Sequence, residues 1–147
     1  AMLEVKTKDG RGKTVKIRTP YDADSLYELT ASGKTFIEEA TKSPGSSENL
    51  RPTLTSQYQR TTIVDHDTST RMTCDEYLLC TDWENQSVDF PYCILETKSS
   101  VQPSPFDVWL WEHGFRSQRI SKYCTMLAIL HPDLPANKWH RVIKNYM

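Results

Sequence analysis

Residues 71–75 are Arg71-Met72-Thr73-Cys74-Asp75, a run that alternates in character from one residue to the next. Successive side chains of a β-strand point to opposite faces. The alternation therefore places Arg71, Thr73 and Asp75 on one face and Met72 and Cys74 on the other. This pattern predicts a strand with one charged face and one apolar face.

The same alternation recurs elsewhere in the chain. Strands of this kind are predicted over residues 3–8, 14–18, 54–64 and 92–98. The first two flank Asp9-Gly10-Arg11-Gly12, a turn signal, and so predict a hairpin. Tyr58 and Arg60 share a face of the third, and Glu96 and Lys98 share a face of the fourth. Residues 83–89 are polar and are predicted to form a loop.

The last third of the chain is predicted to be helical. Ser104 and Pro105 favour a helix start and Gly114 a helix end. Ser121 is expected to cap a helix that ends at Leu130, with Tyr123, Leu127 and Leu130 as its packing stripe, and Pro135 to open a last helix. Short helices are also predicted from Asp22 or Asp24 to Leu29 and from Ser32 to Thr41.

Length and composition exclude several classes of protein. The 147 residues suit one domain. A formal net charge of −1 argues against a general nucleic-acid binder. The apolar runs are too short for a membrane-spanning helix, and no signal-peptide pattern opens the chain. The 4 cysteines form no C-x-x-C pair and are expected to be buried thiols in a reducing cytoplasm. Ala1 is expected to be a leftover residue before a native Met2.

The charged faces of the predicted strands carry an excess of cations. For any one strand, a solvated face is the simpler interpretation. Across five strands, however, seven cations face two acids, Asp75 and Glu96, or three acids with Glu4; the cations are Lys6, Lys8, Lys16, Arg18, Arg60, Arg71 and Lys98. Such clustering suits a chain of phosphates, and the acids suit a hard divalent metal. The apolar faces are expected to pack against the helices, so the charged faces point to solvent or line a closed sheet.

Ser121-Lys122-Tyr123 fits the same picture. A helix N-terminus offers free N–H groups and partial positive charge, and Lys122 adds a full charge. The alternative is an ordinary N-cap followed by an exposed lysine.

Six motifs occur in a fixed order: Leu3-Glu4-Val5-Lys6, Lys13-Thr14-Val15-Lys16-Ile17-Arg18, Tyr58-Gln59-Arg60, Arg71-Met72-Thr73-Cys74-Asp75, Ile94-Leu95-Glu96-Thr97-Lys98 and Ile120-Ser121-Lys122-Tyr123. Together they resemble the vacuolar transporter chaperone (VTC) domain, the polyphosphate polymerase branch of the triphosphate tunnel metalloenzymes in the CYTH-like superfamily. The resemblance covers nearly the whole chain. The ending Leu134-Pro135-Ala136-Asn137-Lys138-Trp139-His140 is similar to a bacterial subgroup of this family.

The resemblance implies an α+β fold in which helices pack around an antiparallel β-barrel tunnel. By resemblance, the catalytic tunnel cations are Lys6, Lys16, Arg60, Arg71 and Lys122. Tyr58 corresponds to a tunnel-lining tyrosine, and Glu96 to the acidic ligand of Mn²⁺ or Mg²⁺. Arg18, Lys98 and Ser121 join the substrate-binding set because they share strand faces or the helix start with these residues.

The chain also departs from the family pattern. Family members carry further strands upstream, and some carry a second Ser and Lys where this chain has Cys124 and Thr125. Residues 1–147 are therefore expected to form a single VTC-like domain that corresponds to the C-terminal two-thirds of the family domain, with an incomplete barrel. Two chains completing each other as a homodimer, an inactive remnant, and a misplaced start are the alternatives.

The resemblance implies an enzyme that binds nucleoside triphosphate and polyphosphate and transfers a phosphoryl group to a growing polyphosphate chain. A tunnel triphosphatase and a non-catalytic polyphosphate-binding module are the alternatives. Nucleic acid is not expected as a partner, because Tyr58 alone offers a stacking ring along the basic face.

Overall fold

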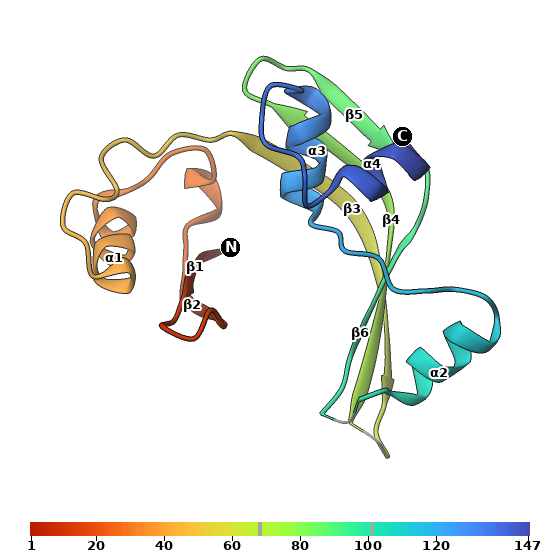
Figure 1. Cartoon of the computed structure of the whole chain (residues 1–147). Helices are drawn as coiled ribbons and strands as arrows, with labels where there is room; N and C mark the ends of the chain where they lie inside the picture. Colours follow the sequence, from red (N-terminus) through yellow and green to blue (C-terminus); the bar gives the residue numbers. More distant parts are fainter. Residues whose placement is uncertain (68, 101) are drawn as a thin grey trace. The chain divides into compact units, whose positions relative to one another are not determined.

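The structure is a computed structural model that describes residues 1–67, 69–100 and 102–147 (Figure 1). In chain order its elements are β1 (Met2–Lys8), β2 (Thr14–Pro20), the short 3₁₀ helix η1 (Ala23–Ser25), α1 (Ala31–Thr41), β3 (Leu54–Asp65), β4 (Thr70–Asp82), β5 (Ser87–Phe90), β6 (Ile94–Lys98), α2 (Pro105–Glu112), α3 (Lys122–Leu130) and α4 (His140–Tyr146). The chain divides into two compact units, Ala1–Pro52 and Thr53–Met147, which are described one at a time. The single domain over residues 1–147 stays a prediction.

The first unit is built on the predicted hairpin. β1 and β2 pair antiparallel from Met2 opposite Pro20 to Lys8 opposite Thr14. The Asp9 carboxylate accepts the backbone N–H groups of Arg11 and Lys13, and Gly12 adopts a left-handed φ of 77°, which together close the turn.

The helices of this unit differ in extent from the prediction. α1 begins two residues earlier than expected, because Thr30 rather than Ser32 is the N-cap and accepts the N–H of Gly33. The helix predicted to reach Leu29 is only the three-residue η1, capped by Asp22.

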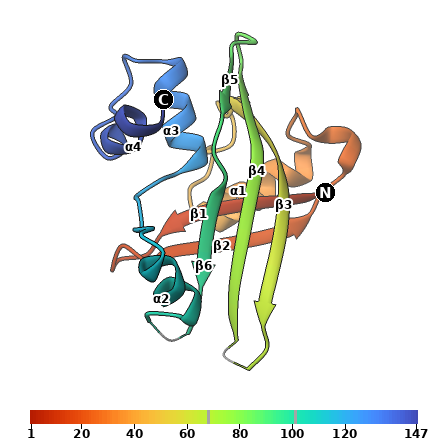
Figure 2. The same ribbon diagram turned by 90° about the vertical axis from the view of Figure 1, so that its right-hand side faces the viewer.

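In the second unit, β4 is the central strand of a four-stranded antiparallel sheet. β3 pairs with one edge of β4, and β5 and β6 pair in turn along the other edge, as Figure 2 shows. The strand predicted at 71–75 is thus part of a strand of 13 residues. The predicted loop at 83–89 is wrong in its second half, since Asp82 accepts the N–H groups of Glu84 and Gln86 in a tight turn that leads directly into β5.

A β-bulge in β4 breaks the simple alternation. Gln57 lies opposite Leu79 but Gln59 lies opposite Glu76, so β4 carries one extra residue there, and Tyr77 adopts a φ of 55°. The face that carries Asp75 therefore continues through even-numbered positions, and Leu78, Cys80 and Asp82 are buried. The bulge joins a charged half and an apolar half on one face of the sheet.

The core lies on the apolar half of that face, beneath α3. Met126 is fully buried against Leu78, Cys80, Phe90 and Ile94. The predicted stripe of Tyr123, Leu127 and Leu130 is wrong; the buried residues of α3 are Thr125, Met126 and Ala128. The contact of Lys122 with Asp75 of β4 determines which face of α3 turns toward the sheet, because Lys122 lies one turn before Met126 on the same face of the helix.

The other two helices meet the prediction to different extents. Ser104 caps α2 in a capping box with Asp107, as expected, and Gly114 ends it with a φ of 84°. The last helix begins at His140 rather than at Pro135, since the backbone N–H of Trp139 closes a turn onto the carbonyl of Ala136 first.

In the described part of the chain, antiparallel sheets and four α-helices confirm the mixed α and β composition, with a helical last third. Over residues 1–67, 69–100 and 102–147, the strands form two separate sheets and no closed barrel, so the barrel stays a prediction. The expectation that charged faces point away from the helices is wrong for β4, whose Asp75 face is the one that α3 covers. In the described part of the chain, no helix is both long and apolar enough to cross a membrane.

The bulge makes a prediction about two neighbouring leucines. Unbroken alternation from Asp75 puts Leu79 inside, whereas the structure buries Leu78 fully and leaves Leu79 39% exposed. We expect Leu78→Ala to lower the free energy of unfolding by about 3 kcal/mol through the cavity it leaves, and Leu79→Ala by less than about 1 kcal/mol. Urea denaturation of both variants checks this, and a larger loss for Leu79→Ala contradicts the bulge.

Candidate functional site

In the first unit, charged side chains gather on one face of the hairpin. Glu4 lies opposite Arg18 and Lys6 lies opposite Lys16 in the β1–β2 register. The Glu4 carboxylate binds both Arg18 and Lys6, the latter at 3.0 Å. The hydrogen bonds from Lys6 and then Arg18 lower the pKa of Glu4 to about 2, so this carboxylate is ionised at neutral pH.

In the second unit, the site is built around the carboxylate of Asp75. Its side chain is 0% exposed, and Arg60 on β3 lies directly opposite it. Arg60 grips it with two parallel hydrogen bonds, 2.5 Å from Nε to Oδ1 and 2.6 Å from Nη2 to Oδ2. This paired geometry is the strongest that an arginine makes with a carboxylate, and it fixes the guanidinium plane.

Lys122 reaches the same carboxylate from the start of α3. Its Nζ lies 2.5 Å from Asp75 Oδ2. The helix begins there because Ser121 accepts the backbone N–H of Cys124, which confirms the predicted N-cap. Hydrogen bonds from Arg60 and Lys122 lower the pKa of Asp75 against the opposing effect of burial.

The ring of Tyr58 lies beside both cations. Its centroid is 5.1 Å from Cζ of Arg60 and 5.2 Å from Nζ of Lys122. Both distances are within the range of cation–π attraction. Tyr58 therefore helps to hold the two cations in place at the edge of solvent.

Beyond Asp75, the charged half of the sheet continues onto β6. Glu96 lies opposite Thr73, and Lys98 lies opposite Arg71. Lys98 Nζ is 2.9 Å from the Glu96 carboxylate, and this hydrogen bond lowers the pKa of Glu96, with further contributions from the charges of Lys122 and Arg60. We call the following residues the strand-face cluster: Tyr58, Arg60, Arg71, Asp75, Glu96, Lys98 and Lys122.

The structure therefore brings most of the predicted residues of the second unit together. Arg60, Lys122, Tyr58, Glu96 and Lys98 lie within one set of mutual interactions, Arg71 is paired in register with Lys98, and Ser121 caps the helix that carries Lys122. Lys6, Lys16 and Arg18 lie on the hairpin of the first unit, on one face of that hairpin. The catalytic and binding roles of all these residues stay predictions.

Asp75 was predicted only as an acid suited to a metal, whereas in the structure it is the carboxylate that binds Arg60 and Lys122. Its alternation with Arg71 placed it on the charged face, but the sequence gives no sign that a carboxylate there would be completely buried. Because of the bulge, which the sequence does not reveal, the face that carries Asp75 is also the face that buries Leu78 and Cys80 beneath α3.

In this site, Glu96 has the one carboxylate that is available to bind a divalent metal. Asp75 is already bound by Arg60 and Lys122, which leaves Glu96, and no group of three or more His, Cys, Asp or Glu residues gathers elsewhere in the described chain. Mg²⁺ commonly binds through one or two carboxylates together with phosphate oxygens and water. Glu96 suits a metal that arrives with a phosphate ligand.

Loss of the Asp75 charge is predicted to destabilise the fold. We expect Asp75→Asn to lower the free energy of unfolding at pH 7 by about 2 kcal/mol, below the ~3–5 kcal/mol of a fully buried pair because Arg60 and Lys122 retain access to water. Glu76→Gln, the same change at an exposed neighbour, is the control and should cost little.

The ion pairs of Asp75 also make the free energy of unfolding depend on pH. Because folding lowers the pKa of Asp75, its stabilisation is present above the unfolded-state value of about 3.9 and is lost as the pH falls below it. The stability gap between the wild type and Asp75→Asn, measured by denaturation at pH 7 and pH 3, should therefore narrow at pH 3. A gap that stays constant contradicts the ion pair.

The sequence was compared with models of known protein families, with curated proteins and with solved structures. A family model for the VTC domain matches residues 1–131. No curated protein and no solved structure matches the chain. The matched region contains the hairpin cations, the whole strand-face cluster and all of α3. This chain belongs to the VTC domain family.

Proposed function

We propose that this chain is a polyphosphate polymerase-like domain whose strand faces bind the phosphate chain of a nucleoside triphosphate and of polyphosphate. Membership of the VTC family indicates a polyphosphate-related function. The particular ligands, the metal and the transfer step are our proposal, and they are supported by the charges described above.

One observation carries the proposal: cations lie directly opposite cations on neighbouring strands. Lys6 faces Lys16 across the hairpin, and Arg71 faces Lys98 across β4 and β6. Like charges directly opposite each other destabilise an antiparallel pair. A bound anion removes that repulsion, and a phosphate chain supplies a row of negative charges to a row of cations.

The buried carboxylate holds Arg60 and Lys122 without using up their donors. Arg60 gives Asp75 two of its five N–H groups, and Lys122 gives it one of three. The remaining donors are free to bind phosphate oxygens at fixed positions. Asp75 therefore acts as a positioning residue, and Arg60 and Lys122 act as preorganised phosphate ligands.

In the proposed reaction, an oxygen at the end of the polyphosphate chain attacks the terminal phosphorus of the nucleoside triphosphate. The bond from that phosphorus to the bridging oxygen breaks, the nucleoside diphosphate leaves with the electron pair, and the polymer gains one phosphate. Arg60, Arg71, Lys98 and Lys122 align the two chains and neutralise charge on the transferred group. Mg²⁺ or Mn²⁺ bound at Glu96 would neutralise further phosphate charge.

The same proposal includes a tunnel. In it the charged strand faces line the interior of an antiparallel barrel, closed either within one chain or by two chains as a homodimer. Unpaired strand edges favour such closure, because β3 has 12 residues and its pairing in the described sheet is with β4 alone.

A non-catalytic polyphosphate-binding module is the second candidate. It is favoured by the ion pairs of Arg60 and Lys122, since the single Asp75 carboxylate already offsets part of the charge of two of the five proposed catalytic cations. Product analysis separates the candidates: longer polymer indicates the polymerase, free phosphate from the triphosphate indicates a triphosphatase, and binding without turnover indicates the module.

Binding to polyphosphate tests the proposal directly. We expect Arg71→Ala combined with Lys98→Ala to weaken polyphosphate binding at least tenfold in calorimetry, because the opposed cations lose their charge. Lys144→Ala, which removes a cation on α4 outside the strand-face cluster, is the control and should leave affinity unchanged. Equal affinities of the double variant and the control refute the strand face as the binding site.

Glu96 has a separate test. We expect Glu96→Gln to abolish the increase in polyphosphate affinity that Mn²⁺ produces, while binding without metal stays the same or tightens because a negative charge has gone. Glu76→Gln serves as the charge-matched control. Metal-dependent tightening that survives in Glu96→Gln contradicts the assignment of this residue as the metal ligand.

A further inference from the structure

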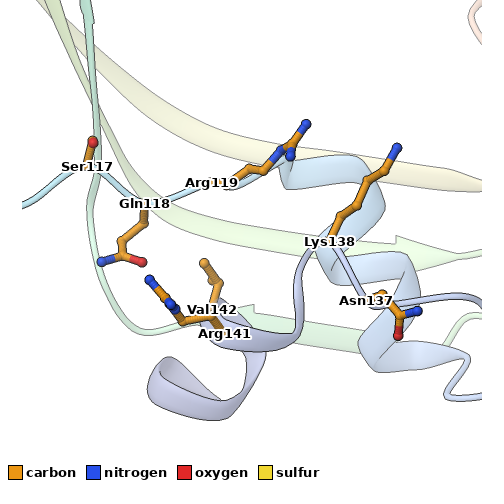
Figure 3. Close-up of a pocket in the computed structure, with 7 residues that line it drawn as sticks. All are labelled: Ser117, Gln118, Arg119, Asn137, Lys138, Arg141 and Val142. Atoms are coloured by element: carbon orange, nitrogen blue, oxygen red, sulfur yellow. The ribbon is translucent and has the colours of Figure 1, made fainter.

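A cavity of about 540 Å³ lies between the segment before α3 and the segment around the start of α4. Its lining residues are Ser117, Gln118, Arg119, Asn137, Lys138, Arg141 and Val142 (Figure 3). None of them belongs to the strand-face cluster. The volume is within the range of about 300–1,000 Å³ that small-molecule sites occupy.

The lining carries three cations and no carboxylate. Arg119, Lys138 and Arg141 contribute full positive charges, while Gln118, Asn137 and Ser117 add neutral hydrogen-bonding groups. Among the residues that the structure describes, none of the three cations takes part in an ion pair. This contrasts with Arg60 and Lys122, which both form an ion pair with Asp75.

The cations are arranged at two ends of the cavity. In Figure 3, the side chains of Arg119 and Lys138 extend in the same direction, whereas the side chain of Arg141 extends the other way, on the side of Gln118. A single small anion reaches one end at a time. A ligand with several separated negative groups reaches both, and Arg and Lys heads with amide N–H groups match phosphate oxygens.

We propose that this cavity is a second anion site, which binds a short chain of phosphates between Arg119 and Lys138 at one end and Arg141 at the other. The site goes beyond the proposed function, which concerns the strand faces. The phosphate chain is the shared chemistry of free oligophosphate and of a nucleotide. Arg119 lies two residues before Ser121, so a ligand here contacts the segment that leads into the cap of α3.

The test is a titration of the intact chain followed through its backbone amide signals by NMR, with tripolyphosphate, ATP, orthophosphate and a glutamate peptide of matched charge as probes. Signals of residues 117–119 and 137–142 report the cavity, and signals of Arg60 and Lys98 report the strand face. The two sites are thereby read separately, so failure of one proposal is distinguishable from failure of the other.

We expect saturable shifts of the cavity signals with tripolyphosphate, at least tenfold weaker binding of orthophosphate and of the peptide, and equal binding of ATP. The double variant Lys138→Ala, Arg141→Ala should weaken cavity binding at least tenfold and leave the strand-face titration unchanged. Arg119→Ala alone should weaken it to a smaller degree. Lys144→Ala, which removes one cation from the same helix as Arg141 and matches Arg119→Ala in charge, should bind like the wild type.

Several results overturn the proposal. These are an absence of saturable shifts at the cavity, orthophosphate or the peptide binding as well as tripolyphosphate, or ATP binding much more tightly through its base. A double variant that matches Lys144→Ala also overturns it. Unchanged signals from β3 and β4 in each variant establish that the fold is intact, and Arg119→Ala provides the same test should the double variant fail to fold.

Discussion

The structure of the second unit depends on one buried carboxylate and the two cations that bind it. Asp75 is 0% exposed and is gripped by Arg60 from β3 and by Lys122 from α3. A buried carboxylate without partners is strongly unfavourable, so the strand, its neighbour and the helix are held in one arrangement. The same contacts set the rotation of α3, because Met126 follows Lys122 by one turn and enters the core beneath the helix. Packing and charge placement thus have a common origin.

Around this centre the charged faces keep an excess of positive charge. On the sheet, Arg60, Arg71, Lys98 and Lys122 exceed Asp75 and Glu96, and on the hairpin Glu4 balances only part of Lys6, Lys16 and Arg18. In both units one cation lies directly opposite another across a strand pair. On a solvated sheet face, opposed cations only repel each other. On a phosphate-binding face, the same opposed cations attract the bound anion. The cavity at Arg119, Lys138 and Arg141 adds a third concentration of unbalanced cations outside these faces.

Much of this was predictable from the sequence, and the exceptions have physical causes. Alternation identified the hairpin, β3, β6 and the residues that share their faces, and Ser104 and Ser121 marked two helix starts. The bulge at Tyr77 was not predictable, because nothing local distinguishes the extra residue from the pattern on either side. Alternation continued from Asp75 puts Leu79 in the core, whereas the structure buries Leu78 and Cys80. Periodicity alone chose Tyr123, Leu127 and Leu130 for a helix whose rotation a distant aspartate determines. Asp75 itself was visible as a charged-face residue, but its burial depends on tertiary contacts.

The central claim is that Asp75 positions Arg60 and Lys122 while Arg71 and Lys98 hold a phosphate chain beside them. The most direct measurement is an experimental structure of the chain with tripolyphosphate bound. The account predicts phosphate oxygens in contact with Arg71 and Lys98 and with the outward donors of Arg60 and Lys122, and an intact contact of both cations with Asp75. A ligand bound away from this face, or an Asp75 released by both cations, contradicts it.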